Sequence, residues 1–275
     1  LSPADSGHVL GQGARGIGRG ARMNRAALAR SQLTLRVIPP RIGYGRFPIP
    51  ANYDEALSGI QRLRGRRYFA DGAIPPAALD AQGRHVTAED EQSYHLALWN
   101  GEVQGCLRVR LYPRPSRPLT EFRVYDLIRR MPDELAKHYN AGMDEFINAY
   151  RARGFEPGES GGWAINPKYQ NDPAMLALPL AGWSFSRIHS RLIWVAAAAE
   201  RNGSTKILKR LCGWRLKLAG QELPPFYDAA YKCQMELLCF DSDIINPRFE
   251  PAVREFQMLL EEKCVGLPEL RHQEG

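Results

Sequence analysis

The sequence has few cysteines and no long hydrophobic run, and both absences narrow the class of protein. Five cysteines occur among 275 residues, an odd number, and no two of them form a Cys-x-x-Cys pair. These facts argue against a disulfide framework and a cysteine-based zinc site, so we expect reduced thiols, no bound metal and a cytoplasmic protein. The longest apolar run, residues 192–199, is far shorter than the roughly 18–20 residues that a membrane span needs.

Acidic residues are almost absent from the first fifty positions, where Asp5 stands against eight arginines. The whole chain holds 37 basic and 30 acidic side chains, a net charge of +7, so residues 51–275 have no net charge. We predict a basic, flexible N-terminal arm over residues 1–45 and a single domain over residues 46–275. Residues 1–22 are rich in Gly and Arg, and they are either a functional tail or non-native sequence. A nucleic-acid-binding domain more often carries its basic residues on the fold itself, which disfavours nucleic acid as a partner.

Hydrophobic periodicity predicts helices that alternate with strands along the domain. The strongest local signal is Asn100-Gly101 between two alternating segments, which is typical of a hairpin turn. The predicted helices span 53–63, 132–153, 174–189, 204–212 and 251–264. The predicted strands span 93–99, 102–111, 163–165, 192–198, 215–218 and 234–240. This order indicates a fold of the α/β or α+β class with a mixed sheet.

Five stretches of the sequence resemble segments of one enzyme superfamily. Residues 62–64 (RLR), with Tyr68 four positions on, look like its entry segment R-L-R-x-x-V-[FY]. Residues 89–96 (EDEQSYHL) and 105–108 (GCLR) are similar to its D-x-x-S-x-H-L and G-x-x-R-[LV] stretches. Residues 158–169 (GESGGWAINPKY) resemble E-x-x-R-x-x-V-x-P-x-[YF]-R, and residues 207–214 (ILKRLCGW) resemble a late helix that ends in R-x-x-G-[FW].

Together these stretches resemble the GNAT superfamily of N-acyltransferases, above all its acyl-homoserine-lactone synthases and long-chain N-acyl amino acid synthases. The resemblance implies a central twisted, mostly antiparallel sheet flanked by helices. Three departures disfavour lactone formation and ordinary acetyl-CoA binding. Thr87 stands three residues before Asp90 where lactone synthases have a second aspartate, Gly162 replaces an arginine, and residues 170–175 (QNDPAM) lack the glycines of a pyrophosphate loop.

Forming an amide from a thioester requires a neutral amine and hydrogen-bond donors for the carbonyl oxygen. A carboxylate beside the amine can take up the proton of its ammonium form, so Glu159 and Asp90 are candidate catalytic residues. Each is equally well interpreted as a solvated loop carboxylate. His95 is the third candidate, although a hydrogen-bonded core histidine is its more common role.

The resemblance also implies binding residues. Some of them have a structural alternative: a salt bridge for Arg108, a helix face for Arg64, the core for Trp163, and a solvated face for Lys209 and Arg210. The candidates for substrate binding are Arg64, Tyr68, Arg108, Trp163, Ala164, Ile165 and Asn166. The candidates for acyl-donor binding are Lys168, Gln170, Lys209 and Arg210.

We therefore expect a bacterial N-acyltransferase that moves a medium or long acyl chain to an amino acid or similar small-molecule amine. Its co-substrate would be an acyl carrier protein or CoA thioester, with no other bound cofactor, and an acyl carrier protein would be its partner. The first alternative is an acyl-homoserine-lactone-type synthase, which would consume S-adenosylmethionine. An alternative of another class is a non-catalytic protein that binds nucleic acid through the Arg/Gly arm.

Overall fold

An eight-stranded sheet runs through the part of the chain that the structure, a computed structural model, describes: residues 25–41, 46–112, 121–189 and 191–264. Its strands are β1 (Thr34–Ile38), β2 (Tyr94–Asn100), β3 (Glu102–Leu111), β4 (Glu156–Ile165), β5 (Leu192–Ala199), β6 (Trp214–Arg215), β9 (Phe226–Asp228) and β10 (Cys233–Asp241). Two further short strands, β7 (Lys217–Leu218) and β8 (Gln221–Glu222), pair with each other.

Helices connect and cover these strands. They are α1 (Arg25–Arg30), α2 (Tyr53–Ala70), α3 (Val124–Ile128), α4 (Asp133–Arg151), α5 (Ala177–His189), α6 (Ser204–Arg210) and α7 (Glu250–Glu261). Short 3-10 turns add η1 (Pro76–Ala78), η2 (Asp90–Gln92), η4 (Pro167–Tyr169) and η5 (Pro173–Leu176). No helix among the described residues combines the length and apolarity needed to cross a bilayer.

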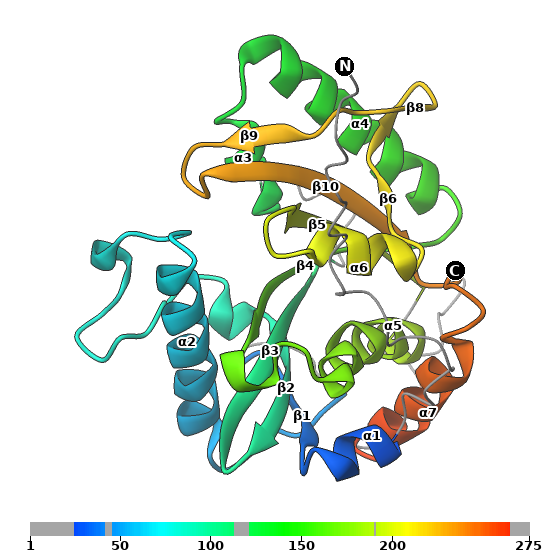
Figure 1. Cartoon of the computed structure of the whole chain (residues 1–275). Helices are drawn as coiled ribbons and strands as arrows, with labels where there is room; N and C mark the ends of the chain where they lie inside the picture. Colours follow the sequence, from blue (N-terminus) through cyan, green and yellow to red (C-terminus); the bar gives the residue numbers. More distant parts are fainter. Residues whose placement is uncertain (1–24, 42–45, 113–120, 190, 265–275) are drawn as a thin grey trace, which may run out of the picture.

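The strand order is β1-β2-β3-β4-β5-β10-β6, and β9 also pairs with β10. Every pair of this sheet is antiparallel except β4 and β5, which are parallel. Figure 1 shows β1–β4 in one half of the molecule and β5, β6, β9 and β10 in the other. The prediction of a mixed, mostly antiparallel sheet flanked by helices is confirmed.

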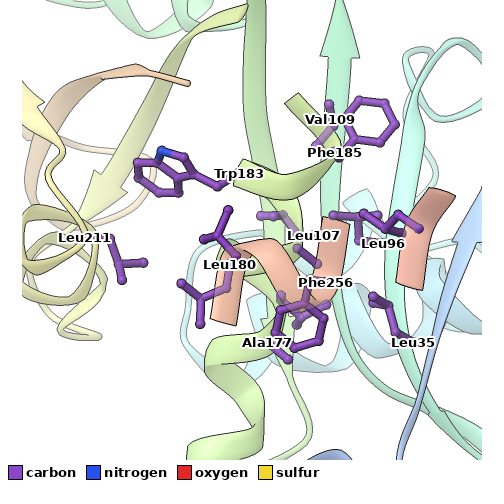
Figure 2. Packing of buried hydrophobic residues seen from close by; sticks show 14 of the residues in the cluster. Leu35, Leu96, Leu107, Val109, Ala177, Leu180, Trp183, Phe185, Leu211 and Phe256 are labelled. Atoms are coloured by element: carbon purple, nitrogen blue, oxygen red, sulfur yellow. The ribbon is translucent and has the colours of Figure 1, made fainter. Parts of the chain in front are cut away.

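Helices cover both faces of the sheet. On one face, α1, α5 and α7 pack their apolar side chains against β1, β2 and β3, and Figure 2 shows Leu180, Phe185 and Phe256 among the side chains of this core. On the other face, α2 packs against β1–β3, and α3 and α4 pack against β5 and β10. Strand β4 lies between these two groups of helices, and its residues are buried or half-buried.

The N-terminal boundary differs from the prediction of an arm over residues 1–45. Residues 25–41 belong to the domain, because β1 pairs antiparallel with β2 from Thr34↔Trp99 to Ile38↔His95. Leu33 and Leu35 are buried in the core beside α5 and α7. The alternation of apolar residues here is short and ends at two prolines, so it gives little local evidence of a strand. Residues 1–24 lie outside the described residues.

Candidate active site

The parallel strands β4 and β5 stay paired for four positions and then separate. Their register runs from Glu156↔Leu192 to Glu159↔Val195. Beyond this point β4 continues beside β3, and β5 continues beside β10. A cavity of about 470 Å³ lies in this fork and is lined by residues 159–165 of β4 and 196–199 of β5. Figure 1 shows the two strands meeting between the halves of the molecule.

A tryptophan fills the base of the fork. A Cβ atom on Gly158 would lie 2.3 Å from Cζ3 of Trp194, so only a glycine lets the indole lie against β4. The Trp194 Nε1–H donates to Oγ of Ser186 on α5 at 2.6 Å, which fixes the ring. Gly158 and Trp194 are directly opposite in the register, one position before the strands part.

Strand β4 carries a bulge at the cavity. Cys106 lies opposite Ala164 and Arg108 opposite Gly161, so Leu107 faces two residues of β4. One of the two is Gly162, whose φ of +63° is in the left-handed region that favours glycine. The Cys106 thiol donates to the Gly162 carbonyl at 3.4 Å.

The bulge explains why glycine stands where the resembling enzymes have arginine. A Cβ atom on Gly162 would lie 3.1 Å from Cβ of Arg108 and 3.6 Å from Nη1 of Arg64. The Arg64 guanidinium and the Cβ atom of Arg108 therefore already occupy the space beside this position.

Asp90 holds the guanidinium groups of Arg64 and Arg108 in place. It is 1% exposed, and Arg64 binds it through both terminal nitrogens, at 2.8 Å to Oδ1 and 2.6 Å to Oδ2. Gln61 and the Thr87 N–H also donate to Oδ2, and the Thr87 hydroxyl and Arg108 donate to Oδ1. Although burial opposes ionisation, these donors hold the pKa of Asp90 well below its ordinary value.

Arg108 extends the charged cluster toward α3. Its Nη1 donates to the Thr87 hydroxyl at 2.8 Å and lies 3.6 Å from Glu89. Glu89 in turn binds Arg123, the residue before α3, at 3.1 Å. The Thr87 hydroxyl thus links Asp90 to Arg108.

Glu159 lies at the fork, on the last residue of β4 that is paired with β5. Its Oε1 accepts from the Val124 N–H at 2.8 Å, and its Oε2 accepts from the Arg123 N–H at 2.8 Å and the Tyr112 hydroxyl at 2.9 Å. Burial raises the pKa of Glu159 above its ordinary value, and these hydrogen bonds only partly oppose the shift. Among the predicted carboxylates, Glu159 is the one that lines the cavity.

The two sides of the cavity differ in chemistry. The side beneath α2 and α3 is polar, with Arg64, Tyr68, His85, Thr87, Arg123 and Tyr231 in its wall. The opposite side, toward α5 and α6, is apolar, with Leu107, Trp183, Trp194, Ile207, Leu208 and Phe240. The Trp183 and Phe240 rings meet perpendicular to each other, 5.3 Å apart. A ligand in the fork can therefore place a polar group on one face of the sheet and an apolar group on the other.

Most of the predicted site residues line the cavity. They are Glu159, Arg64, Tyr68, Arg108, Trp163, Ala164, Ile165 and Gln170. The others lie behind its wall or outside it, namely Asp90, His95, Asn166, Lys168, Lys209 and Arg210. In the part of the chain that the structure describes, no three His, Cys, Asp or Glu side chains are placed to hold a metal ion.

Specific contacts explain the positions of those outside the cavity. His95 is fully buried, and its Nε2–H donates to the Asp90 carbonyl at 2.9 Å, so its geometry does not support the predicted catalytic role. Burial also lowers the pKa of His95 to about 4. Asn166 donates to Gln104 at 2.8 Å, and Lys209 pairs with Glu236. Lys168 and Arg210 are exposed.

Four residues of the polar side were missed by the sequence reasoning as site candidates: His85, Thr87, Arg123 and Tyr231. Thr87 carried a signal, because a hydroxyl three residues before an aspartate is well placed to bind it. The other three lie in segments without hydrophobic periodicity, and tertiary packing alone brings them to the cavity.

Solved structures with similar folds include acyltransferases. The CoA-dependent acyl-homoserine lactone synthase BjaI, with MTA, is 16% identical, and the match covers 86% of this chain and 90% of BjaI with a TM-score of 0.50. The CoA-dependent acyl-homoserine lactone synthase MesI is 13% identical, and the match covers 83% of this chain and 95% of MesI with a TM-score of 0.49. FeeM, an N-acyl amino acid synthase from uncultured soil microbes, is 12% identical, and the match covers 84% of this chain and 97% of FeeM with a TM-score of 0.46.

No protein-family model and no curated protein matches the sequence. The similarity to BjaI is one of fold, since the identity is low. Together with the mixed sheet and its parallel pair β4–β5, it shows that this chain has a GNAT-like fold.

Proposed function

We propose that this protein is an N-acyltransferase that moves a medium or long acyl chain from a carrier-protein or CoA thioester to the amine of an amino acid or similar acceptor. The observation that carries the proposal is the cavity in the fork, which joins an apolar side beneath α5 and α6 to a polar side beneath α2 and α3. A thioester with a long apolar chain and a polar amine must meet in such a place for an amide to form.

In this proposal the acyl chain occupies the apolar side, and the thioester carbonyl lies at the β4 bulge near Gly162 and Trp163. Backbone N–H groups of the bulge would donate to the carbonyl oxygen. Glu159 would take up the proton of the acceptor ammonium, because it lines the cavity and its pKa is raised toward neutral pH. The neutral amine then attacks the carbonyl carbon, the C–S bond breaks, and the thiolate takes up a proton.

We assign Asp90 a positioning role rather than the role of base. Each of its oxygens already accepts from three donors, which leaves no room for an incoming ammonium group. By holding Arg64 and Arg108, it shapes the polar side of the cavity. The His95 ring holds the η2 turn, which begins at Asp90, through its hydrogen bond to the Asp90 carbonyl.

The four residues predicted to bind the acyl donor are polar or basic. Gln170 lines the cavity and Lys168, Lys209 and Arg210 lie outside it, so we propose that these cations meet an acidic acyl carrier protein or the phosphates of CoA. BjaI has been solved with SAM and isopentyl-CoA, which keeps a lactone synthase as the alternative product class.

The test is mass spectrometry of organic extracts from a bacterial host that expresses the chain or its Glu159→Gln variant. Glu134→Gln on the exposed face of α4 is the matched control. An N-acyl amino acid series that Glu159→Gln abolishes and the control retains would support the proposal. A lactone product formed with consumption of S-adenosylmethionine would favour the alternative. If folded protein makes neither product, also with purified acyl thioesters and mixed amines, the proposal is wrong.

A further inference from the structure

His85 is a cavity residue to which the proposed reaction gives no role. It lies in the loop between η1 and η2 and forms part of the polar wall. His95, the histidine that the sequence favoured, is buried behind that wall. The imidazole that a ligand can reach is therefore a different one.

The fold holds the His85 backbone firmly against α2. Its N–H donates to the Gln61 carbonyl at 3.1 Å, and its own carbonyl accepts from Nη2 of Arg64 at 2.6 Å. A Cβ atom on Gly65 would lie 2.5 Å from the Gly83 carbonyl oxygen and 3.1 Å from the His85 nitrogen. Glycine at position 65 thus lets the loop lie directly on the helix.

The His85 ring can form a hydrogen bond with a ligand through only one of its nitrogens. Its Nδ1 is buried and has no hydrogen-bond partner among the described residues. The ring lies against the Tyr68 ring, with centroids 5.7 Å apart and planes at 62°. Nε2 is therefore the atom that can meet a substrate, and a neutral ring that carries its proton there is a hydrogen-bond donor.

The surrounding charges keep this ring neutral. Arg64 of α2 and Arg123 before α3 disfavour an imidazolium, Arg108 of β3 does so to a smaller extent, and Asp90 of η2 opposes them. Burial is the largest cause, and together these effects lower the pKa of His85 to about 4. A ring that resists protonation suits a hydrogen-bond donor better than a proton carrier.

The loop of His85 and the bulge of β4 flank the same side chain. Arg64 donates to the His85 carbonyl through Nη2, and its Nη1 is 3.6 Å from the position that a Cβ on Gly162 would take. We propose that His85 is a catalytic residue whose Nε2–H donates a hydrogen bond to the thioester carbonyl oxygen as that oxygen gains negative charge. This rests on the proposed acyl transfer, and it adds a side-chain donor to the backbone donors of the bulge.

His85 keeps its proton throughout the proposed reaction. The bond that forms is between the amine nitrogen and the acyl carbon, and the bond that breaks is between that carbon and sulfur. The amine nitrogen gives up one proton as the amide forms, and the thiolate takes one up as the thiol product leaves. The donor stabilises the negative oxygen between these two events.

The test compares His85→Phe, His85→Gln and His85→Asn with wild type in steady-state assays of thiol release. The probes are octanoyl-CoA or octanoyl carrier protein and the amino acid that the extract experiment identifies. Phenylalanine keeps a ring without a donor, and glutamine places an N–H about as far from the backbone as Nε2. Asparagine does not reach so far and serves as a second variant without the donor. His138→Gln on exposed α4 is the control, and thermal unfolding checks that each variant is folded.

We expect His85→Phe and His85→Asn to lower kcat about 100-fold with both KM values unchanged, as removal of one oxyanion donor does. His85→Gln should recover most of kcat with an unchanged acid limb of the pH profile. The inference is overturned if His85→Phe keeps wild-type kcat, or if it changes only the acceptor KM. It is also overturned if His85→Gln is as slow as His85→Phe, because that would indicate a proton carrier. A wild-type protein that acylates no amine would instead refute the proposed function.

Discussion

Replacing Asp90 by asparagine removes one charge from the buried cluster of Asp90, Arg64 and Arg108. Arg64 is 2% exposed and Asp90 is 1% exposed, and their bidentate contact excludes water. In the variant, the amide nitrogen would meet N–H donors at the Oδ2 position, which now accepts from Arg64, Gln61 and the Thr87 backbone. Arg64 would stay buried without a counter-ion.

Removing one partner of a buried ion pair costs about 3–5 kcal/mol of the free energy of unfolding. We expect Asp90→Asn to lose this amount at pH 7. With a urea m-value of about 3 kcal/mol per M, the denaturation midpoint falls by roughly 1–2 M. Adding Arg64→Met should restore part of the loss, because the buried positive charge is then also removed.

The loss should also depend on pH. The folded-state pKa of Asp90 is lowered, so its ionised form stabilises the fold above the unfolded value of about 3.9. That contribution disappears as the pH falls through the lower folded-state pKa. Urea denaturation of both proteins at pH 7, 5 and 3 should therefore give curves that converge at the acid end. A loss below about 1 kcal/mol at pH 7, or the same loss at pH 3, would refute this account of the cluster.

Three further predictions concern the fork. Gly158→Ala should cost about 1–3 kcal/mol of unfolding free energy from overpacking against Trp194, and Trp194→Leu in the same chain should relieve it, as chemical denaturation would measure. The rate of acyl transfer in wild type should fall as the pH drops through a pKa above the ordinary glutamate value of about 4.3, because Glu159 then becomes protonated. A wild-type profile without that limb, measured by thiol release, would remove Glu159 as the base. Gly162→Ala should lose about 1–2 kcal/mol because of its positive φ, whereas Gly161→Ala, with no atom within 4 Å of its Cβ, should lose less.

Much of the fold could be predicted because local patterns agree with tertiary structure. The alternation on either side of Asn100-Gly101 predicts the hairpin of β2 and β3, and Gly101 has the positive φ of +67° that its turn requires. Strand β4 was predicted only from Trp163 to Ile165, although it begins at Glu156. Its glycines give no alternation, and its pairing with β5 is a contact across the sequence that no local pattern encodes.

The site residues that lie in a recognisable motif could be predicted from the sequence. Those that tertiary packing alone brings to the cavity could not. The resemblance singled out Glu159, Arg64 and Arg108, and all three line the cavity. His85 reaches the same wall because Gly65, twenty positions earlier, leaves room for its loop. The resemblance singled out His95, which lies in one of its motifs, whereas His85 lies in a segment that no motif marks.

Because the parallel ladder between β4 and β5 is short, a ligand bound in the fork affects the stability of the whole domain. The cavity takes its walls from both halves of the sheet, so any molecule seated in the fork cross-links them. Such a ligand adds about 2.7 kcal/mol to the stability at a concentration 100 times its Kd. The melting temperature therefore reports ligand binding without any catalytic turnover. Thioesters and amines can be ranked as ligands by how far each raises it, before any product has been seen.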